Sequence, residues 1–300
     1  MNRDRESWLA ERRSGIGGSD AAATVGLDPW KTALDVFLQK TGQVEAEDLD
    51  EVERVRFGNI MEAPIADEYA RRYGVKVRRR NQILRNAAYP WMIANVDRVI
   101  EGRRCGLECK NVDGMAYRLG DWGEPGTDEV PEHYLLQCRH YMIVTGFDEW
   151  HLAACVGGNR LVVYVIRRDA SLDEMLIEGE HAFWQCVESG HAPEPDFRHA
   201  STAGLLKKLY PATDGREIQF GADIEHWHAI KMDADARVKE YSAASEAAKN
   251  HILWTMGEAA IGRLADGSAY RRKLIEKKAY TVEAHQYIDC RHVRAKADGA

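Results

Sequence analysis

The 300-residue chain lacks the marks of a membrane or secreted protein. It has no run of about 18 apolar residues and no basic start followed by an apolar leader, so neither a membrane span nor a signal peptide is expected. Its six cysteines are scattered and form no pair of C-x-x-C motifs, which favours free, largely buried thiols in a reducing compartment. These absences predict a cytoplasmic protein.

A basic excess is also missing, since the formal net charge is −7. This argues against a protein that coats DNA tightly, but a DNA enzyme is compatible with it because the field in a cleft depends on local charges. The first 120 residues hold a small basic excess, and the acidic excess follows them. One basic run is either a solvated surface or a contact to phosphate: Arg71, Arg72, Lys76, Arg78, Arg79 and Arg80.

Two short segments carry the main candidate site. Asp97 and Glu108 each follow an apolar-rich stretch, and residues 101–104 between them contain one glycine, which indicates a hairpin. Antiparallel strands would bring Asp97 close to Glu108 and place Lys110 on the same face as Glu108. Paired carboxylates are the oxygen ligands that Mg²⁺ prefers. The pattern predicts a metal site for phosphodiester hydrolysis; a chance spacing is the alternative.

Three further segments hold candidate residues. Residues 15–21 contain glycines that make the backbone flexible, and Ser19 and Asp20 precede an alanine-rich stretch, which predicts the start of a helix. This helix start is either simply capped or binds phosphate together with Arg12 or Arg13. We expect Asp20 to cap, because a carboxylate repels phosphate.

Two predicted helices carry the other candidates. Glu62 falls near the start of a helix over 57–73, as a dipole-compensating glutamate or a ligand. Gln137 and Tyr141 are four residues apart on a helix over 132–144 and share one face. They either meet phosphate, water or DNA backbone, or make a structural hydrogen bond.

Together these segments resemble the PD-(D/E)xK nuclease superfamily, and within it the YqaJ / lambda-exonuclease family of phage recombination nucleases. The resemblance covers residues 8–165, and Val96 stands where the superfamily pattern has proline, a position that tolerates variation. The motifs, in the family's order, are Trp8 and Arg12 with residues 15–21; Phe57 and Gly58 with Glu62; Asn95 and Asp97 with Glu108 and Lys110; and Tyr134 with Gln137 and Tyr141.

The resemblance implies a Mg²⁺-dependent exonuclease that degrades the 5′-ended strand of linear double-stranded DNA and leaves a 3′ overhang for annealing recombination. Two Mg²⁺ ions are expected, with Mn²⁺ as the alternative, at Asp97, Glu108, Cys109 and Glu62. Lys110, which is otherwise an ordinary surface lysine, would orient the attacking water, and Gln137 and Tyr141 would order the site. Arg12 and Ser19 would hold the 5′-phosphate, with Arg13 as the alternative arginine.

The same resemblance implies a homotrimeric ring, a single-strand annealing protein as partner, and a phage or prophage origin in a bacterial host. Superfamily members with iron–sulfur clusters carry three closely spaced cysteines near the C-terminus; here only Cys290 lies there, so neither a cluster nor a structural zinc is expected. The alternatives are a RecB-like nuclease acting on single strands or nicks, and a catalytically silent DNA-end-binding module. Intact Asp97, Glu108 and Lys110 argue against the silent module.

The pattern of elements predicts an α/β fold: a PD-(D/E)xK nuclease core, with a central mixed sheet flanked by helices, and a helical plus β-hairpin C-terminal extension. We expect the core over 1–191, a linker over 192–221 and the extension over 222–300. Predicted helices are 5–13, 19–26, 31–41, 57–73, 132–144, 171–189 and 222–258; predicted strands are 75–85, 91–100, 104–112, 149–156, 160–168, 267–276 and 284–293. A basic tail near the C-terminus contacts duplex, contacts another subunit or is solvated.

Overall fold

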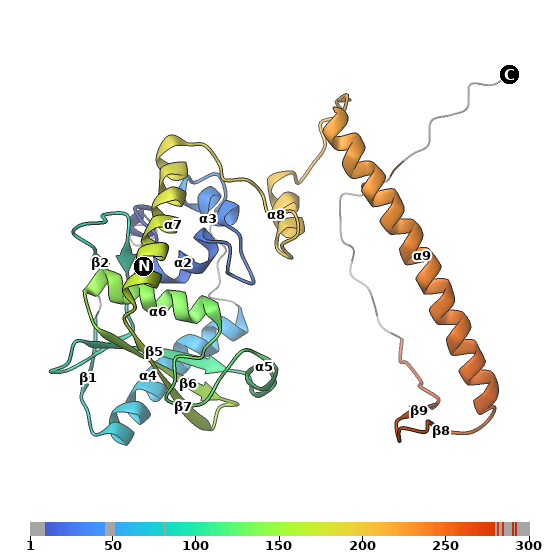
Figure 1. Ribbon diagram of the computed structural model, residues 1–300, viewed down its shortest axis with the longest axis horizontal. Helices are drawn as coiled ribbons and strands as arrows, with labels where there is room; N and C mark the ends of the chain where they lie inside the picture. Colours follow the sequence, from blue (N-terminus) through green and yellow to red (C-terminus); the bar gives the residue numbers. More distant parts are fainter. Residues whose placement is uncertain are drawn as a thin grey trace. The chain divides into compact units, whose positions relative to one another are not determined.

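The computed structural model describes residues 10–45, 52–80 and 82–279, together with residues 281, 284, 290 and 292. Trp8 and most of the predicted strand 284–293 lie outside the described residues. The chain divides into two compact units, Met1–Tyr210 and Pro211–Ala300 (Figure 1).

The first unit is built on a five-stranded mixed sheet, as predicted. Its spatial order is β1-β4-β5-β6-β7, in which β5 and β6 are parallel and the other neighbours are antiparallel. The strands are β1 (Val77–Arg79), β4 (Arg98–Ile100), β5 (Cys105–Val112), β6 (Glu149–Val156) and β7 (Arg160–Arg167). Strand β6, which lies between β5 and β7, is almost wholly buried because helices cover both faces of the sheet.

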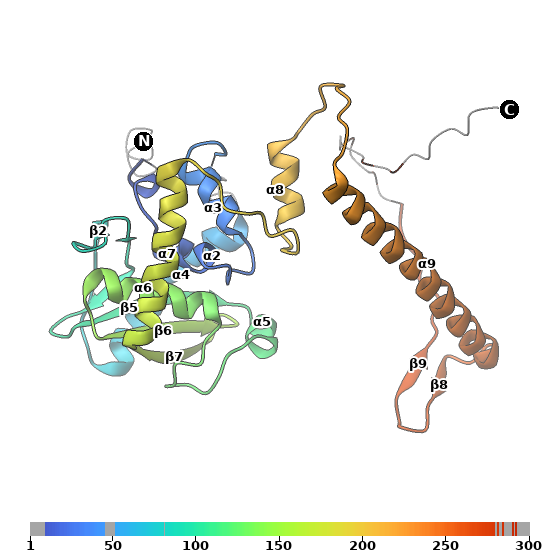
Figure 2. The same ribbon diagram turned by 45° about the horizontal axis from the view of Figure 1, so that its top comes forward.

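Helices flank the sheet on both sides (Figures 1 and 2). Helix α4 (Glu53–Tyr73) packs Ile65 and Tyr69 against one face, and α6 (Glu132–Thr145) packs Cys138 and Met142 against the other. Helices α2 (Gly18–Thr24), α3 (Ala33–Lys40) and α7 (Ala170–Ser189) form a further apolar cluster on the α6 side, and α5 (Gly114–Leu119) follows β5. The site described below lies between α6 and the hairpin β4–β5.

Two predicted strands were too long. The segment 75–85 contains β1 and the separate β2 (Leu84–Arg85), and 91–100 contains β3 (Ile93–Ala94) and β4. β2 pairs with β3 in its own two-stranded sheet. β3 leaves the main sheet because the backbone of Ile16 bonds to it: the Ile16 N–H donates to Trp91 O at 2.6 Å, and the Ile93 N–H donates to Ile16 O at 2.9 Å.

The segment expected as a linker contains a helix that belongs to the first unit. Helix α8 (Thr202–Leu209) buries Leu205 in the same apolar cluster as Phe183 of α7. The first compact unit therefore extends to Tyr210.

The second unit holds a long helix and a small hairpin. Helix α9 (Ala222–Met256) has no buried residue, and β8 (Ile261–Arg263) pairs with β9 (Ala269–Arg271). The predicted turn at 265–268 is confirmed, and it joins β9 to β8, the strand before it. No described helix is long and apolar enough to cross a membrane.

The predicted free thiols are confirmed where they are described. Cys105, Cys138 and Cys155 are buried and unpaired, while Cys290 is exposed.

Candidate active site

The hairpin β4–β5 brings the two predicted carboxylates together. Arg98 pairs with Leu107, so Asp97, directly before β4, lies opposite Glu108. An Asp97 carboxylate oxygen accepts a 2.9 Å hydrogen bond from the backbone N–H of Cys109. The backbone of β5 thus holds Asp97 beside Glu108.

Lys110 and Gln137 complete a closed network around Glu108. Lys110 Nζ lies 2.7 Å from Glu108 Oε1 and donates to Gln137 Oε1 at 2.9 Å. Gln137 Nε2 donates to Glu108 Oε1 at 2.8 Å and to Tyr141 Oη at 3.0 Å. Tyr141 is only 5 % exposed, so its hydroxyl group holds Gln137 in place from the protein interior. It does not face solvent, where a DNA backbone would lie.

The charges of Asp97, Glu108 and Lys110 shift the pKa values in the site, and one carboxylate oxygen is unpaired among the described residues. Burial, and then the nearby Glu108 carboxylate, raise the pKa of Asp97 to about 8. Burial lowers the pKa of Lys110, but Glu108 and Asp97 outweigh it and hold that pKa above its usual range. Glu108 Oε2 is buried and has no hydrogen-bond partner within the described parts of the chain. A buried carboxylate oxygen left unpaired beside a second carboxylate fits the oxygen donor set of a divalent cation.

Glu62 and Cys109 lie at the edge of this group. The Glu62 carboxylate raises the pKa of Asp97 through its charge, and it accepts a hydrogen bond from the guanidinium of Arg98. The Cys109 side chain packs with the apolar cluster under α4, on the opposite face from Glu108. A bond from Cys109 to a cation at Glu108 would therefore come from its backbone carbonyl.

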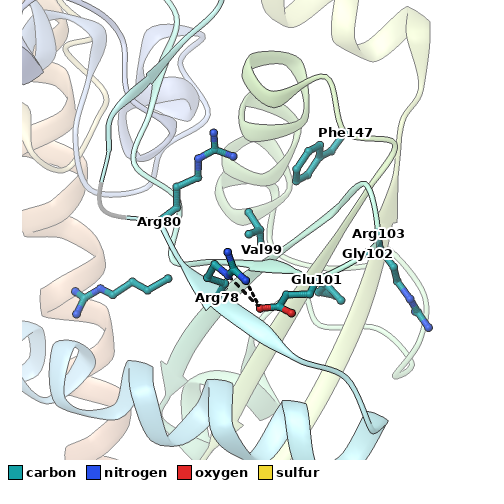
Figure 3. A pocket seen from close by; sticks show the side chains of 9 residues that line it. Arg78, Arg80, Val99, Glu101, Gly102, Arg103 and Phe147 are labelled. Atoms are coloured by element: carbon teal, nitrogen blue, oxygen red, sulfur yellow. Dashed lines mark hydrogen bonds and ion pairs between the residues drawn. The ribbon is translucent and has the colours of Figure 1, made fainter.

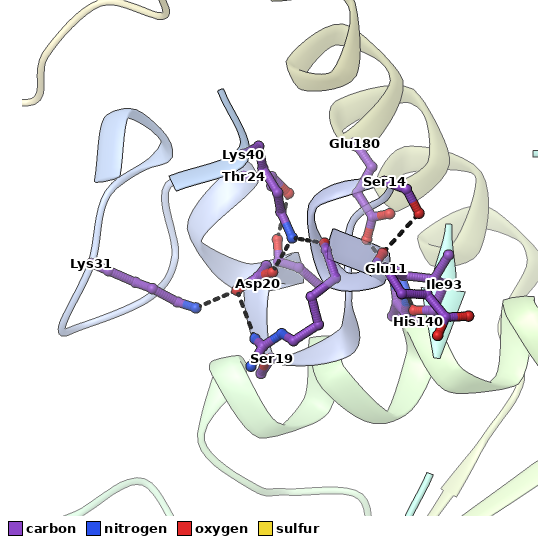
Figure 4. A network of polar contacts seen from close by, with 12 residues as sticks. Glu11, Ser14, Ser19, Asp20, Thr24, Lys31, Lys40, Ile93, His140 and Glu180 are labelled. Carbon is purple, nitrogen blue, oxygen red and sulfur yellow. Dashed lines mark hydrogen bonds and ion pairs between the residues drawn. The ribbon is translucent and has the colours of Figure 1, made fainter. Parts of the chain in front are cut away.

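A second polar cluster forms around Asp20, which is 3 % exposed (Figure 4). Lys31 Nζ lies 2.6 Å and Lys40 Nζ 2.8 Å from its two oxygens, and Arg12 Nη2 lies 3.8 Å from Oδ1. Burial would raise the pKa of Asp20, but Lys31, Lys40 and Arg12 outweigh it and hold that pKa well below its usual range. Three cationic side chains are thereby fixed in one place.

The expected capping role of Asp20 is wrong. Gly17 is the N-cap of α2, no side chain caps it, and Asp20 lies inside the helix as the centre of an ion-pair cluster. Arg12 Nη2 donates to Ser19 Oγ at 3.2 Å, whereas Arg13 is exposed. Of the two candidate arginines, Arg12 is the one beside Ser19.

The two clusters are neighbours because α2 packs directly on α6. A Cβ built on Gly18 would lie 2.4 Å from Tyr141 Cε1, so only glycine permits this approach. Ser19 follows Gly18, and Tyr141 bonds to Gln137. The Arg12–Ser19 pair and the Glu108 network are therefore mechanically linked through one helix contact.

Gly18→Ala should lower the free energy of unfolding by about 1–3 kcal/mol, because the Tyr141 ring must shift to admit a methyl group. Gly17→Ala is the matched control: its backbone angles (φ −90°, ψ 158°) suit alanine, and the nearest atom to its Cβ would be Asp20 Oδ2 at 3.9 Å. Urea denaturation of both variants measures the difference. Equal stabilities would contradict the close packing of α2 on α6.

Part of the basic run lines a pocket of about 510 Å³ at the β1 edge of the sheet (Figure 3). Arg78, in this pocket, is paired with Glu101 at 2.8 Å. Arg71 and Arg72 instead pair with Glu68 on α4. The lining residues are Arg78, Arg79, Arg80, Val99, Ile100, Glu101, Gly102, Arg103 and Phe147.

A Cys–Glu–His group that the sequence reasoning missed lies under α4. Ligand atoms of Cys105, Glu149 and His151 are all within 4.8 Å of one another. His151 bonds to Tyr69 Oη at 2.5 Å and to Glu149 Oε1 at 2.9 Å, so these polar groups already satisfy one another. Cys105 pairs with Glu149 across the parallel strands β5 and β6, a long-range register that local spacing does not reveal.

The functional groups that went unpredicted are the partners of predicted residues. Arg98, Lys31 and Lys40 are distant in sequence from the carboxylates they pair with. Their only signal is that each is a cation within or next to an apolar element.

Comparisons with known proteins identify sequences and structures that are similar to this chain. The family model described as YqaJ-like viral recombinase domain matches residues 7–148. The uncharacterized protein YqaJ of Bacillus subtilis (strain 168) is 34% identical over 284 residues, which cover 92% of this chain and 86% of that protein.

Among solved structures, the alkaline exonuclease LHK-Exo from Laribacter hongkongensis superposes with a TM-score of 0.50 at 15% identity, over 67% of this chain and 99% of that chain. LHK-Exo in complex with dAMP gives a TM-score of 0.48 at 16% identity, over 67% and 99%. The first of these likenesses shows that the core has the nuclease fold expected from the motifs. The sequence relationship goes further: this chain belongs to the YqaJ-like viral recombinase family.

Proposed function

We propose that the protein is a divalent-cation-dependent deoxyribonuclease, and specifically a Mg²⁺-dependent 5′-to-3′ exonuclease on linear double-stranded DNA. The observation that carries this proposal is the convergence of Asp97, Glu108 and Lys110, with Glu108 Oε2 buried and unpaired within the described residues. Family membership supports action on DNA. The product would be a duplex with a 3′ overhang, suited to annealing recombination.

The residues present fit a divalent cation. Asp97 and Glu108 would hold it, together with the Cys109 carbonyl on the same strand as Glu108, and Glu62 would be available to a second ion if Arg98 released it. Bound there, Mg²⁺, or Mn²⁺ in its place, would supply Lewis-acid stabilisation of the phosphoryl oxygens and a more acidic water.

The chain's own residues position the reactants. Lys110, charged in this network, donates a hydrogen bond toward the attacking water or a phosphate oxygen, and Gln137 fixes its direction. The water oxygen forms a bond to phosphorus in line with the departing 3′-oxygen and gives up a proton to solvent, the P–O3′ bond breaks, and the 3′-oxygen takes up a proton. One nucleotide 5′-monophosphate leaves, and the shortened strand carries a new 5′-phosphate.

The 5′ polarity rests on the neighbouring cluster. Arg12 and Ser19 would bind the terminal 5′-phosphate, since a guanidinium and a hydroxyl within hydrogen-bond distance of each other suit an anion. The Gly18–Tyr141 contact keeps the Arg12–Ser19 pair close to Gln137. A phosphate held at Arg12 would thus place the next phosphodiester toward Glu108.

Arg12→Ala should reduce the preference for 5′-phosphorylated over 5′-hydroxyl ends by about 10–100-fold, because one charge-assisted hydrogen bond contributes roughly 1.5–3 kcal/mol. Single-turnover rates on the two ends measure it. Arg13→Ala is the matched comparison, since Arg13 is exposed and adjacent. A larger loss in Arg13→Ala than in Arg12→Ala would transfer the role to Arg13.

The deciding experiment is digestion of end-labelled DNA with Mg²⁺. Linear duplex should be shortened from its 5′ ends, and closed circles should stay intact. Cutting of closed circles, or faster digestion of single strands than of duplex, would favour the RecB-like alternative. No cleavage of any substrate would favour the silent end-binding module.

Two statements stay predictions of the family resemblance: the homotrimeric ring and the annealing-protein partner. The cytoplasmic location stays a prediction from the composition of the sequence. The mass of the protein in solution tests the homotrimeric ring.

A further inference from the structure

A row of aromatic rings runs along the rim of the candidate site. Trp30, in the loop before α3, meets the His133 ring edge-on with centroids 4.7 Å apart, and His133 lies 4.0 Å from Tyr134. Tyr134 continues the row to Trp122 at 5.6 Å. Lys110 Nζ lies 4.9 Å from the Tyr134 ring centre. The row therefore begins at an exposed tryptophan and ends at the lysine of the active site.

The aromatic row also lies next to the polar cluster around Asp20. Trp30 precedes Lys31, whose ammonium group pairs with Asp20 beside Arg12. One loop thus reaches both groups: Lys31 points to the Arg12 cluster and Trp30 to the start of α6. A nucleotide with its 5′-phosphate at Arg12 and its 3′ side near Lys110 would carry its base along these rings.

The rings are suited to stacking. Trp30 is 56 % exposed, and His133 and Tyr134 are half-buried, so faces or edges of all three remain accessible. Burial lowers the pKa of His133 to about 4, with Asp28 opposing and Lys110 reinforcing the shift, so the ring is uncharged near neutral pH. His133 Nε2 is buried and has no hydrogen-bond partner in the described part of the chain. Such a group costs free energy, which is unexpected if the row served packing alone.

We propose that Trp30, His133 and Tyr134 form a stacking surface for the unpaired base of the 5′-terminal nucleotide. This inference deepens the proposed function and rests on it. Aromatic side chains bind bases with little sequence preference, because every base presents a π-face. The surface would thus act on any sequence, but only on a base released from its partner strand.

The test measures binding without hydrolysis. Fluorescence anisotropy in EDTA compares two 5′-phosphorylated single strands, one with a normal terminal nucleotide and one with an abasic terminal residue. The wild-type protein should bind the normal strand about tenfold more tightly, and Trp30→Ala should bind both equally. Trp30→Phe, which keeps a ring, should retain most of the discrimination. Trp254→Ala, which removes an exposed tryptophan of α9, should leave it unchanged.

Two outcomes would overturn the stacking surface: equal affinities of the wild-type protein for the two strands, or full discrimination in Trp30→Ala. Equal loss of affinity for both strands in Trp30→Ala would also overturn it, since that result indicates a structural defect. Failure of the proposed nuclease function gives a different pattern, because wild-type protein would then discriminate between the two strands in EDTA but would not digest linear duplex with Mg²⁺.

Discussion

Glu108→Gln should lower the rate of Mg²⁺-dependent DNA hydrolysis by about 10³-fold or more. The substitution keeps the shape of the side chain but removes the charge on the unpaired buried oxygen. A divalent cation contributes several kcal/mol to the transition state, and each 1.36 kcal/mol is tenfold in rate, so about 4 kcal/mol gives this loss. Quenched single-turnover digestion of linear duplex measures it.

The fold should survive this change. Gln137 and Lys110 still have an oxygen to bond at position 108, and one of the two neighbouring carboxylates loses its charge. Glu178→Gln, an exposed glutamate of α7, is the control and should retain the wild-type rate. A Glu108→Gln protein that digests DNA at near wild-type rate would remove Glu108 from the mechanism.

Asp20→Asn should destabilise the first unit by about 3–5 kcal/mol and lower its Tm by roughly 10 °C. The reason is that Lys40, whose side chain is only 5% exposed, loses the carboxylate 2.8 Å away. The amide oxygen left at position 20 and the backbone carbonyl of Arg12 can still accept hydrogen bonds from Lys40, but neither carries a counter-charge. A buried ammonium group without a counter-charge carries most of the cost.

The effect should depend on pH in a defined direction. Lys31, Lys40 and Arg12 hold the pKa of Asp20 well below its usual range against the effect of burial. The stability that ionised Asp20 contributes is therefore present above the unfolded-state pKa of about 3.9 and is lost as the pH falls through the folded-state value. In Asp20→Asn, this part of the acid-side decline should disappear.

Urea denaturation from about pH 2 to pH 7 measures both the free energy of unfolding and its pH dependence. Asp67→Asn, an exposed aspartate of α4, should change neither. Adding Lys40→Met to Asp20→Asn should restore part of the lost stability, because replacing a buried ion pair by apolar groups is often neutral. A single variant as stable as wild type would show that the ion pairs contribute little.

The hairpin chemistry was readable from the sequence because it is local. Asp97, Glu108 and Lys110 belong to adjacent strands joined by a short turn, and strand alternation alone sets which side chains share a face. The five-stranded sheet and the helices around it followed in the same way from apolar periodicity. Local patterns of this kind are insensitive to the rest of the fold.

Interactions between distant segments were not readable. Asp20 was interpreted as a cap, because the residues adjacent to it in the sequence do not indicate that Lys31 and Lys40 are its partners. Likewise, one strand was predicted over 91–100, because the bonds from β3 to Ile16 depend on how the N-terminal segment folds back. The aromatic row joins a loop to a helix in the same non-local manner.

The alternation along β5 separates two duties within three consecutive residues. Glu108 and Lys110 project toward α6 and its polar network, whereas the Cys109 thiol between them packs in the apolar cluster beneath α4. In the proposed mechanism, Cys109 would therefore contribute through its main chain, which holds Asp97. Substitution of the Cys109 side chain by another small apolar residue would therefore leave the groups on the opposite face unchanged.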